Sequence, residues 1–112
     1  MPRYIDIDHV GIILKEEFMD SFGLSMNALA NAIGVPANYI HGIVHGLRGI
    51  SAGMDLRLTR YFGLSRGYFL NLQNRCDMLA AMREITDAEL ERIVPLSAHN
   101  AARAERRIGL AG

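Results

Sequence analysis

The chain has 112 residues, and its 12 basic (Lys and Arg) and 12 acidic (Asp and Glu) side chains give a formal net charge of zero at pH 7. Half of the residues are hydrophobic, which allows one domain with a modest core and excludes a disordered chain. Zero net charge argues against a protein that coats nucleic acid through a large positive field, but it permits a local basic patch. The single cysteine cannot form an intramolecular disulfide. With no signal peptide or membrane-length apolar run in the sequence, we expect a cytoplasmic protein.

The first part of the chain predicts a short lead followed by one amphipathic helix. Residues 1–8 are apolar and acidic without a helical stripe, so we expect a surface arm or a segment that docks on a neighbour. A helix should begin at about residue 8 or 9, where an acidic side chain favours the positive end of the helix. Leu14, Phe18 and Phe22 recur at intervals of four and should face the core, and the glycine that follows should end the helix.

Residues 25–46 predict two short helices joined by a tight turn. Ser25 is a good N-cap for a helix over residues 26–33, and Gly34 can take the left-handed conformation that closes it. Pro36 is tolerated only in the opening turn of a helix, so a second helix should start there and run to about residue 45. Gly46 should close this second helix in the same way.

The second of these helices should have two different faces. Ile40, Ile43 and Val44 fall on one side, which we predict to be core. The opposite side should be free to contact a partner, and it carries Asn38, His41, Gly42 and His45. This arrangement is typical of a helix-turn-helix, whose second helix enters the major groove of DNA. Its spacing alone also fits a helical hairpin that merely packs.

Two further helices should follow. A glycine-flanked loop over residues 47–50 precedes Ser51, which can cap a helix over residues 52–62. That helix is apolar on most sides, so we predict that it is buried, with Arg57 and Arg60 extending outward. In the next helix, apolar residues recur at steps of three and four, which is typical of a helix-pairing seam and equally of core. The residues of this stripe are Phe69, Leu72, Cys76 and Leu79.

The end of the chain carries only local signals. The segment from Thr86 to Glu89 is a capping box, which predicts a helix that Pro95 stops. Ser97 is a candidate cap for a last, alanine-rich helix that contains Arg103, Arg106 and Arg107. We interpret this tail as frayed and solvated, in preference to an extra phosphate contact or a segment that binds a partner protein.

Four segments together resemble a known family. They are IILKEEF, GLSMNALANAIGVPANYIHGIVHGLRGIS, LRLTRYFGLS and FLNLQ, and they occur in this order between Ile12 and Gln73. Their content and spacing resemble the HigA antitoxins, also called virulence-associated protein I, within the lambda-repressor-like helix-turn-helix superfamily. The resemblance extends from His9 to Asp77, about two thirds of the chain.

This resemblance implies an all-α fold. It places a lambda-repressor-like five-helix DNA-binding domain at residues 9–83, with its helix-turn-helix at 25–46, and leaves a C-terminal helical extension or tail at 84–112. The implied function is a DNA-binding antitoxin that represses its own type II toxin-antitoxin operon and neutralises a RelE-like toxin that cleaves messenger RNA. The implied partners are operator DNA, a small toxin and a second copy of the chain. Two alternatives remain, a stand-alone transcription regulator and a helical protein-binding module that has lost DNA binding.

The resemblance also indicates which residues touch DNA. It places the loop of Arg48 over the DNA backbone, where a guanidinium suits phosphate or guanine, although a solvated loop charge is the plain alternative. We expect Asn38 and His41 to read bases, and Tyr39 and Asn27 to hold phosphates. The full predicted set is Asn27, Ala37, Asn38, Tyr39, His41, His45 and Arg48. The predicted dimer interface is the stripe of Phe69, Leu72, Cys76 and Leu79, in which Cys76 is a small buried hydrophobe and not a nucleophile.

Several of these positions depart from the family pattern. The family tends to place glutamine at Met26, asparagine at His45 and polar or basic residues at Tyr39, Gly42 and Leu47. The predicted DNA face is therefore poor in permanent charge, and we expect modest affinity with a shallow salt dependence.

His41 and His45 are four residues apart and share a helix side, which suits a pair of metal ligands, but no adjacent carboxylate or cysteine completes a site. The sequence also lacks a phosphate-binding glycine loop, a nucleophile elbow and a paired-carboxylate motif. We therefore predict no metal, no cofactor and no enzymatic activity.

Overall fold

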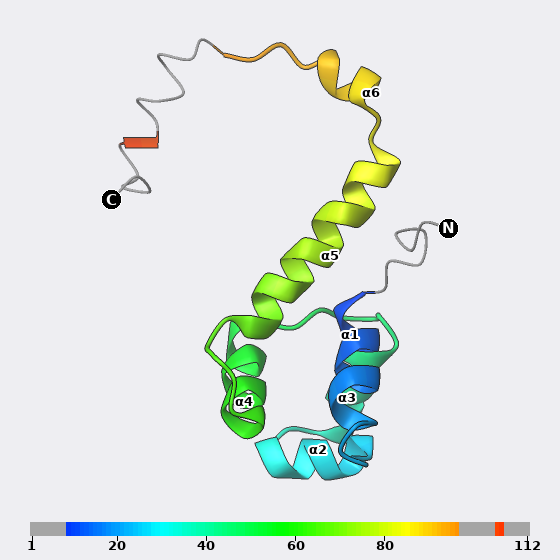
Figure 1. Ribbon diagram of the computed structural model, residues 1–112, viewed down its shortest axis with the longest axis vertical. Helices are drawn as coiled ribbons and strands as arrows, with labels where there is room; N and C mark the ends of the chain where they lie inside the picture. Colours follow the sequence, from blue (N-terminus) through cyan, green and yellow to red (C-terminus); the bar gives the residue numbers. More distant parts are fainter. Residues whose placement is uncertain (1–8, 97–104, 107–112) are drawn as a thin grey trace. The chain divides into compact units, whose positions relative to one another are not determined.

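The computed structural model describes residues 9–96 and 105–106, and every regular element within these ranges is a helix. The predicted all-α fold is thereby confirmed (Figure 1). The described chain divides into two compact units, one ending at Met82 and the other beginning at Arg83. The helices are α1 (Val10–Ile13), the π-helix η2 (Leu14–Met19), α2 (Met26–Ile33), α3 (Ala37–Val44), α4 (Ala52–Phe62), α5 (Tyr68–Glu84) and α6 (Asp87–Glu91).

The first helical segment is not one regular α-helix. His9 caps it, since its Nδ1 accepts a hydrogen bond of 3.1 Å from the Gly11 N–H. From Leu14 the segment widens to a π-helix, and the widened turn buries residues five apart, Leu14 and Met19. The prediction that Phe22 faces the core is wrong, because its side chain is 68% exposed. Its ring stacks on the ring of Phe62, the last residue of α4.

A glycine allows this segment to approach α3 closely. A Cβ atom at Gly11 would lie 1.8 Å from the Ile43 carbonyl oxygen, which is far inside van der Waals contact, so only glycine fits at this position. Figure 1 shows α1 and α3 side by side as a result. Because α1 braces α3 from behind, the opposite face of α3 is left free.

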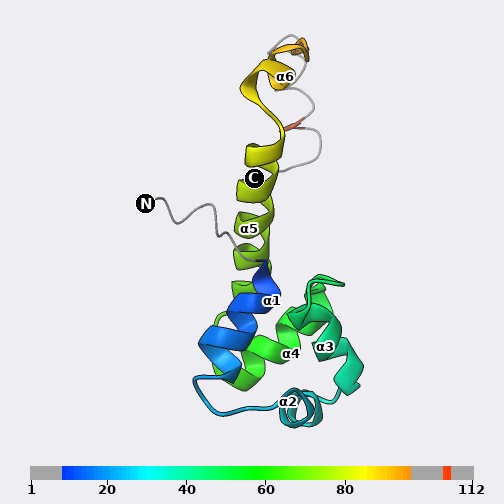
Figure 2. The same ribbon diagram turned by 90° about the vertical axis from the view of Figure 1, so that its right-hand side faces the viewer.

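The helix-turn-helix matches the prediction. The Ser25 hydroxyl accepts a 3.0 Å hydrogen bond from the Ala28 N–H at the start of α2, and Gly34 ends this helix in the left-handed conformation. Pro36 lies one position before α3 as its N-cap residue, not inside its first turn. Figure 2 shows α2 nearly end-on beneath α3. Both helices bury their apolar faces in the same core, which includes Leu29 and Ile40.

Helix α4 is only half buried, contrary to the prediction. Met54 and Leu58 enter the core, but Leu56 and Tyr61 are 50% and 44% exposed. Arg57 is exposed, as predicted, and its guanidinium also donates a 2.7 Å hydrogen bond to the carbonyl oxygen of Ile33, a contact that the sequence did not indicate. Arg57 therefore satisfies the last turn of α2 from a neighbouring helix.

A buried carboxylate fixes the start of α5. Asp55 on α4 is 1% exposed, and its two oxygens accept hydrogen bonds from three backbone N–H groups at the beginning of α5. The donors are Gly67 (2.6 Å), Phe69 (2.9 Å) and Leu70 (3.1 Å). A helix N-terminus has free N–H groups and a partial positive charge. This carboxylate accepts hydrogen bonds from the N–H groups, and its negative charge interacts favourably with the helix dipole.

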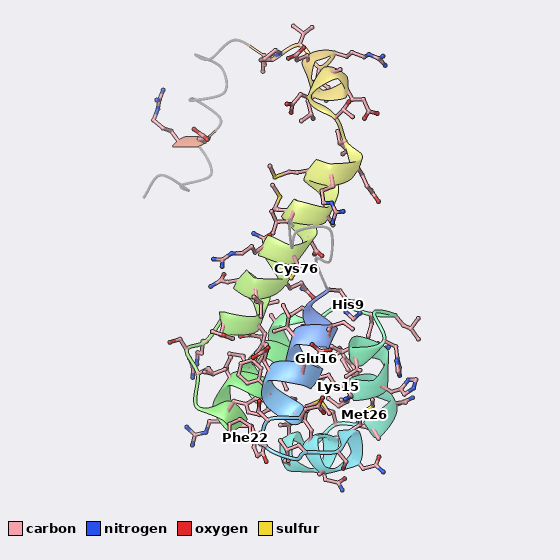
Figure 3. All side chains as sticks on the ribbon, turned by 45° about the vertical axis from the view of Figure 1, so that its right-hand side comes forward. His9, Lys15, Glu16, Phe22, Met26 and Cys76 are labelled. Carbon is pink, nitrogen blue, oxygen red and sulfur yellow. The ribbon has the colours of Figure 1, made fainter. Side chains whose placement is uncertain are left out.

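The apolar stripe of α5 begins in the core and ends at the surface. Phe69 is fully buried among the rings of Phe18 and Phe62, so in a single chain it belongs to the core. Cys76 is buried, as predicted, whereas Leu79 is 41% exposed. Figure 3 shows Cys76 on α5 and His9 at the start of α1. Of the stripe predicted as a dimer interface, Leu79 offers the most surface to a partner.

The second unit contains α6, whose capping box is confirmed. The Thr86 hydroxyl accepts a 3.1 Å hydrogen bond from the Glu89 N–H, and the Glu89 carboxylate accepts one of 2.9 Å from the Thr86 N–H. The helix ends at Glu91, before the predicted stop at Pro95, and none of its residues is buried. The predicted arm at 1–8 and most of the predicted last helix lie outside the described residues. Among the helices that the structure describes, none is long and apolar enough to cross a membrane.

Candidate nucleic-acid interface

The solvent-facing side of α3 carries most of the residues that the sequence assigns to DNA. Asn38, His41 and His45 are exposed, and Ile40 and Ile43 on the opposite side are fully buried. The predicted division of this helix into a core face and a free face is therefore confirmed for these residues. Amide and imidazole groups can donate and accept hydrogen bonds at base edges, and both types are present on the free face.

Gly42 departs from the prediction. It was expected on the free face, but it is buried, because the side chain of Arg48 lies across it. A Cβ atom at Gly42 would lie 3.1 Å from Cγ and 3.3 Å from Cδ of Arg48. The missing side chain thus provides a shallow groove on α3, and the apolar stem of Arg48 occupies it.

The charged end of Arg48 rests on an aromatic ring. Its Cζ atom lies 4.0 Å from the centroid of the Tyr39 ring, which is a cation–π contact worth about 0.5–1 kcal/mol at an exposed site. Tyr39 is half buried and Arg48 is exposed, so the guanidinium is held along α3 while it stays open to solvent. This contact gives Tyr39 a structural role that the sequence did not indicate.

The loop that carries Arg48 is held to the rest of the unit by backbone hydrogen bonds. The Gly42 carbonyl oxygen accepts from the N–H groups of Leu47 (2.8 Å) and Arg48 (3.3 Å), which turns the chain back against the end of α3. The far end of the loop is bound to α5, where the Gln73 side chain pairs with the backbone of Ile50. The sequence contains Gln73 in the FLNLQ segment but does not indicate this contact.

The two histidines of α3 lie against each other. The ring centroids of His41 and His45 are 4.0 Å apart with an interplanar angle of 65°, and both side chains are exposed. The pair presents up to four nitrogens to a polar surface such as a base edge or a phosphate. Over the part of the chain that the structure describes, no group of three or more His, Cys, Asp or Glu side chains is placed to hold a metal ion.

The remaining predicted DNA contacts lie at helix starts. Asn27 is exposed in the first turn of α2, and Ala37 is the half-buried first residue of α3. N–H groups at a helix start are suited to phosphate oxygens. Arg48 is the one permanently charged residue in the predicted set, so the interface combines one cation with neutral donors.

Comparison with known proteins gives close relatives. No protein-family model matches the chain. The chain is 43% identical over 89 residues to virulence-associated protein I of Dichelobacter nodosus, an alignment that covers 80% of this chain and 81% of that protein. It is also 32% identical over 69 residues to antitoxin HigA-1 of Vibrio cholerae, which covers 62% of this chain and 65% of that protein.

Solved structures share the fold. The chain is 39% identical to a structure of the Pseudomonas aeruginosa antitoxin HigA with the higBA promoter, with a TM-score of 0.71 over 80% of this chain and 97% of that one. A second P. aeruginosa structure, a protein in complex with its 18 bp operator DNA, is 39% identical with a TM-score of 0.73, covering 80% and 96%. A HigA-family antidote protein of Coxiella burnetii is 32% identical with a TM-score of 0.71, covering 80% and 97%.

Proposed function

Since this chain belongs to the family of HigA-type antitoxins, also called virulence-associated protein I, we propose that it binds the operator of its own operon and represses transcription. Two of the similar structures contain operator or promoter DNA, which supports a DNA partner for this chain. A structure of a HigA homologue with its own promoter also supports autorepression over regulation of a distant gene.

The observation that carries this proposal is the free face of α3 with Arg48 fixed along its edge. In the proposed complex α3 enters the major groove, where Asn38 and His41 reach base edges. Arg48 and Asn27 flank the helix and hold phosphates, which positions the helix without specifying sequence. His41 and His45 extend the polar surface along the groove.

We further propose that the protein acts as a dimer on two half-sites. A lambda-repressor-like dimer reads half-sites about 34 Å apart, which is one turn of DNA. The exposed part of the α5 stripe at Leu79, together with Met78 and Met82 beside it, is an apolar surface that a second copy can cover. Two copies would double the number of phosphate contacts, which offsets the small charge of each reading face.

The proposed partner protein is a small toxin of the RelE type, which cleaves messenger RNA. Family membership supports this part of the proposal, because an antitoxin has a toxin by definition. A nuclease that binds messenger RNA needs a basic surface, so an antitoxin neutralises it by covering that surface.

Operator binding is tested by fluorescence anisotropy of the purified chain with the DNA upstream of its gene and with scrambled DNA, at several salt concentrations. We expect preference for the upstream DNA, and an Arg48→Ala variant that binds about tenfold more weakly, as for the loss of one charged contact. Arg60→Ala is the matched control, because Arg60 is an exposed arginine on α4, which Figure 1 shows on the other side of the unit from α3. Equal weak binding to both DNAs would overturn the proposal and favour a protein-binding module.

The toxin is tested separately by co-expression with the small basic protein encoded beside this gene. We expect the chain to restore growth of cells that express that protein and to copurify with it. Two results would contradict the toxin proposal and favour a stand-alone regulator. Either the adjacent genes encode no small basic protein, or that protein does not copurify with a chain that still binds operator DNA.

A further inference from the structure

The loop between α3 and α4 is ordered although most of it is exposed. Residues 47–49 are exposed, yet the chain is anchored at both ends of the loop. The Gly42 carbonyl oxygen holds the first end, at Leu47 and Arg48, and Gln73 holds the other end, at Ile50. A loop fixed at both ends can hold a side chain in one place, which a free surface loop cannot do.

Gln73 uses both polar atoms of its side chain on one backbone residue. Its Oε1 accepts a 2.7 Å hydrogen bond from the Ile50 N–H, and its Nε2 donates one of 3.0 Å to the Ile50 carbonyl oxygen. A primary amide offers both the donor and the acceptor that this pairing with one backbone residue requires. The contact joins α5 to a residue 23 positions earlier in the chain, and Gln73 itself is half buried.

Gly49 makes this approach possible. A Cβ atom at Gly49 would lie 2.8 Å from Oε1 of Gln73, closer than real Cβ contacts are found. The absence of a side chain at Gly49 therefore leaves room for the Gln73 amide to reach Ile50. None of these three residues, Gly49, Ile50 and Gln73, belongs to the predicted DNA-contact set.

We propose that Gln73 is a positioning residue for DNA recognition: it clamps Ile50 to α5 and so fixes the loop from which Arg48 reaches the DNA. This inference rests on the proposed operator binding. Gln73 itself touches no DNA, and it acts through the backbone at Ile50 and the side chain of Arg48. The hydrogen bonds at Ile50 hold the backbone of the loop that carries Arg48, and the Tyr39 ring holds the guanidinium of Arg48.

The expected size of the effect follows from the order of the loop. If the clamp is removed, the loop must be ordered when DNA binds, and the entropy lost in that step lowers the affinity. We expect the Gln73→Leu variant, which keeps the size of the side chain and removes both hydrogen bonds, to bind operator about tenfold more weakly. Asn74→Leu is the matched control, because Asn74 is the next residue of the same helix, carries an amide and is exposed.

A double-mutant cycle with Arg48 separates positioning from general destabilisation. We expect Gln73→Leu to weaken operator binding little further once Arg48 is alanine, because the clamp acts through Arg48. The slope of log affinity against log salt should fall by about 0.9 in Arg48→Ala, the value for one lost phosphate contact. It should stay near the wild-type value in Gln73→Leu, in which Arg48 still reaches the DNA once the loop is ordered. A variant that is only less stable would lower affinity equally with and without Arg48.

The clamp is also measured without DNA, by hydrogen exchange of the Ile50 amide, which should speed up in Gln73→Leu and not in Asn74→Leu. If Gln73→Leu does not fold, Gln73→Glu replaces it, because it keeps the acceptor and loses the donor. Operator binding by the Gln73 variants equal to that of wild type, or full additivity with Arg48→Ala, would overturn the inference and leave the proposed function intact. Failure of wild type to prefer operator DNA would overturn both.

Discussion

The buried carboxylate of Asp55 gives a sharp prediction about stability. The Asp55→Asn variant keeps the size of the side chain but replaces one acceptor oxygen by a donor. That NH2 group must then face an N–H group at the start of α5, because both Asp55 oxygens accept from backbone donors. The variant therefore loses at least one hydrogen bond to a charged group and leaves a donor without an acceptor.

The magnitude follows from the contacts. A hydrogen bond to a charged group contributes about 1.5–3 kcal/mol, and a negative charge at a partly buried helix start adds up to about 2 kcal/mol. We therefore expect Asp55→Asn to lower the free energy of unfolding by about 3 kcal/mol. For a domain of this size, a loss of 1 kcal/mol lowers the melting temperature by about 4–8 °C, so the expected shift exceeds 10 °C.

The assay is urea unfolding followed by circular dichroism, with the midpoint and the slope compared between variants. Asp20→Asn is the matched control, since Asp20 is an exposed aspartate whose ion pair with Lys15 (3.0 Å) should contribute less than about 1 kcal/mol. If Asp55→Asn loses less than about 1 kcal/mol at unchanged slope, the three hydrogen bonds do not anchor α5 as argued.

Three further substitutions test other contacts. Gly42→Ala should change the free energy of unfolding by less than about 0.5 kcal/mol, because the gain of alanine in a helix is offset by the loss of the Arg48–Tyr39 contact, but it should weaken operator binding by displacing the stem of Arg48; thermal melting and anisotropy together check this. Gly11→Ala should lower the unfolding free energy by about 2 kcal/mol or more, measured by urea unfolding, because its methyl group collides with the Ile43 carbonyl. Arg57→Ala should cost about 1 kcal/mol in the same assay, since it removes the hydrogen bond to the last turn of α2.

Elements with local signals were predictable from the sequence. Ser25 and Gly34 mark the two ends of α2, and the capping box at Thr86 marks the start of α6, because caps depend on residues within one turn. The π-helix was not predictable. Its widened turn buries Met19 and leaves Phe22 at the surface, and a pattern read at intervals of four assumes a regular α-helix.

The contacts that join distant residues were also missed. The sequence placed Arg57 outward, where the structure has it, but it did not indicate that the guanidinium also donates a hydrogen bond to the carbonyl oxygen of Ile33. Gln73 lies beside the apolar stripe of α5, and a half-buried amide there indicates a hydrogen-bond partner elsewhere in the fold. The partner itself, 23 residues away, depends on how the helices pack.

The departures from the family pattern on α3 have a common structural effect. The family resemblance implies polar or basic side chains at the positions of Tyr39 and Gly42, so the proposed DNA face of α3 carries fewer polar groups than the resemblance implies. The structure shows that both contact Arg48, since the glycine accommodates its stem and the ring holds its guanidinium. A cation held in place loses less conformational entropy on binding than a free one. If α3 binds operator as proposed, the affinity should therefore respond to changes at Tyr39 and Gly42 through the position of Arg48, beyond any contact that these two residues make with DNA themselves.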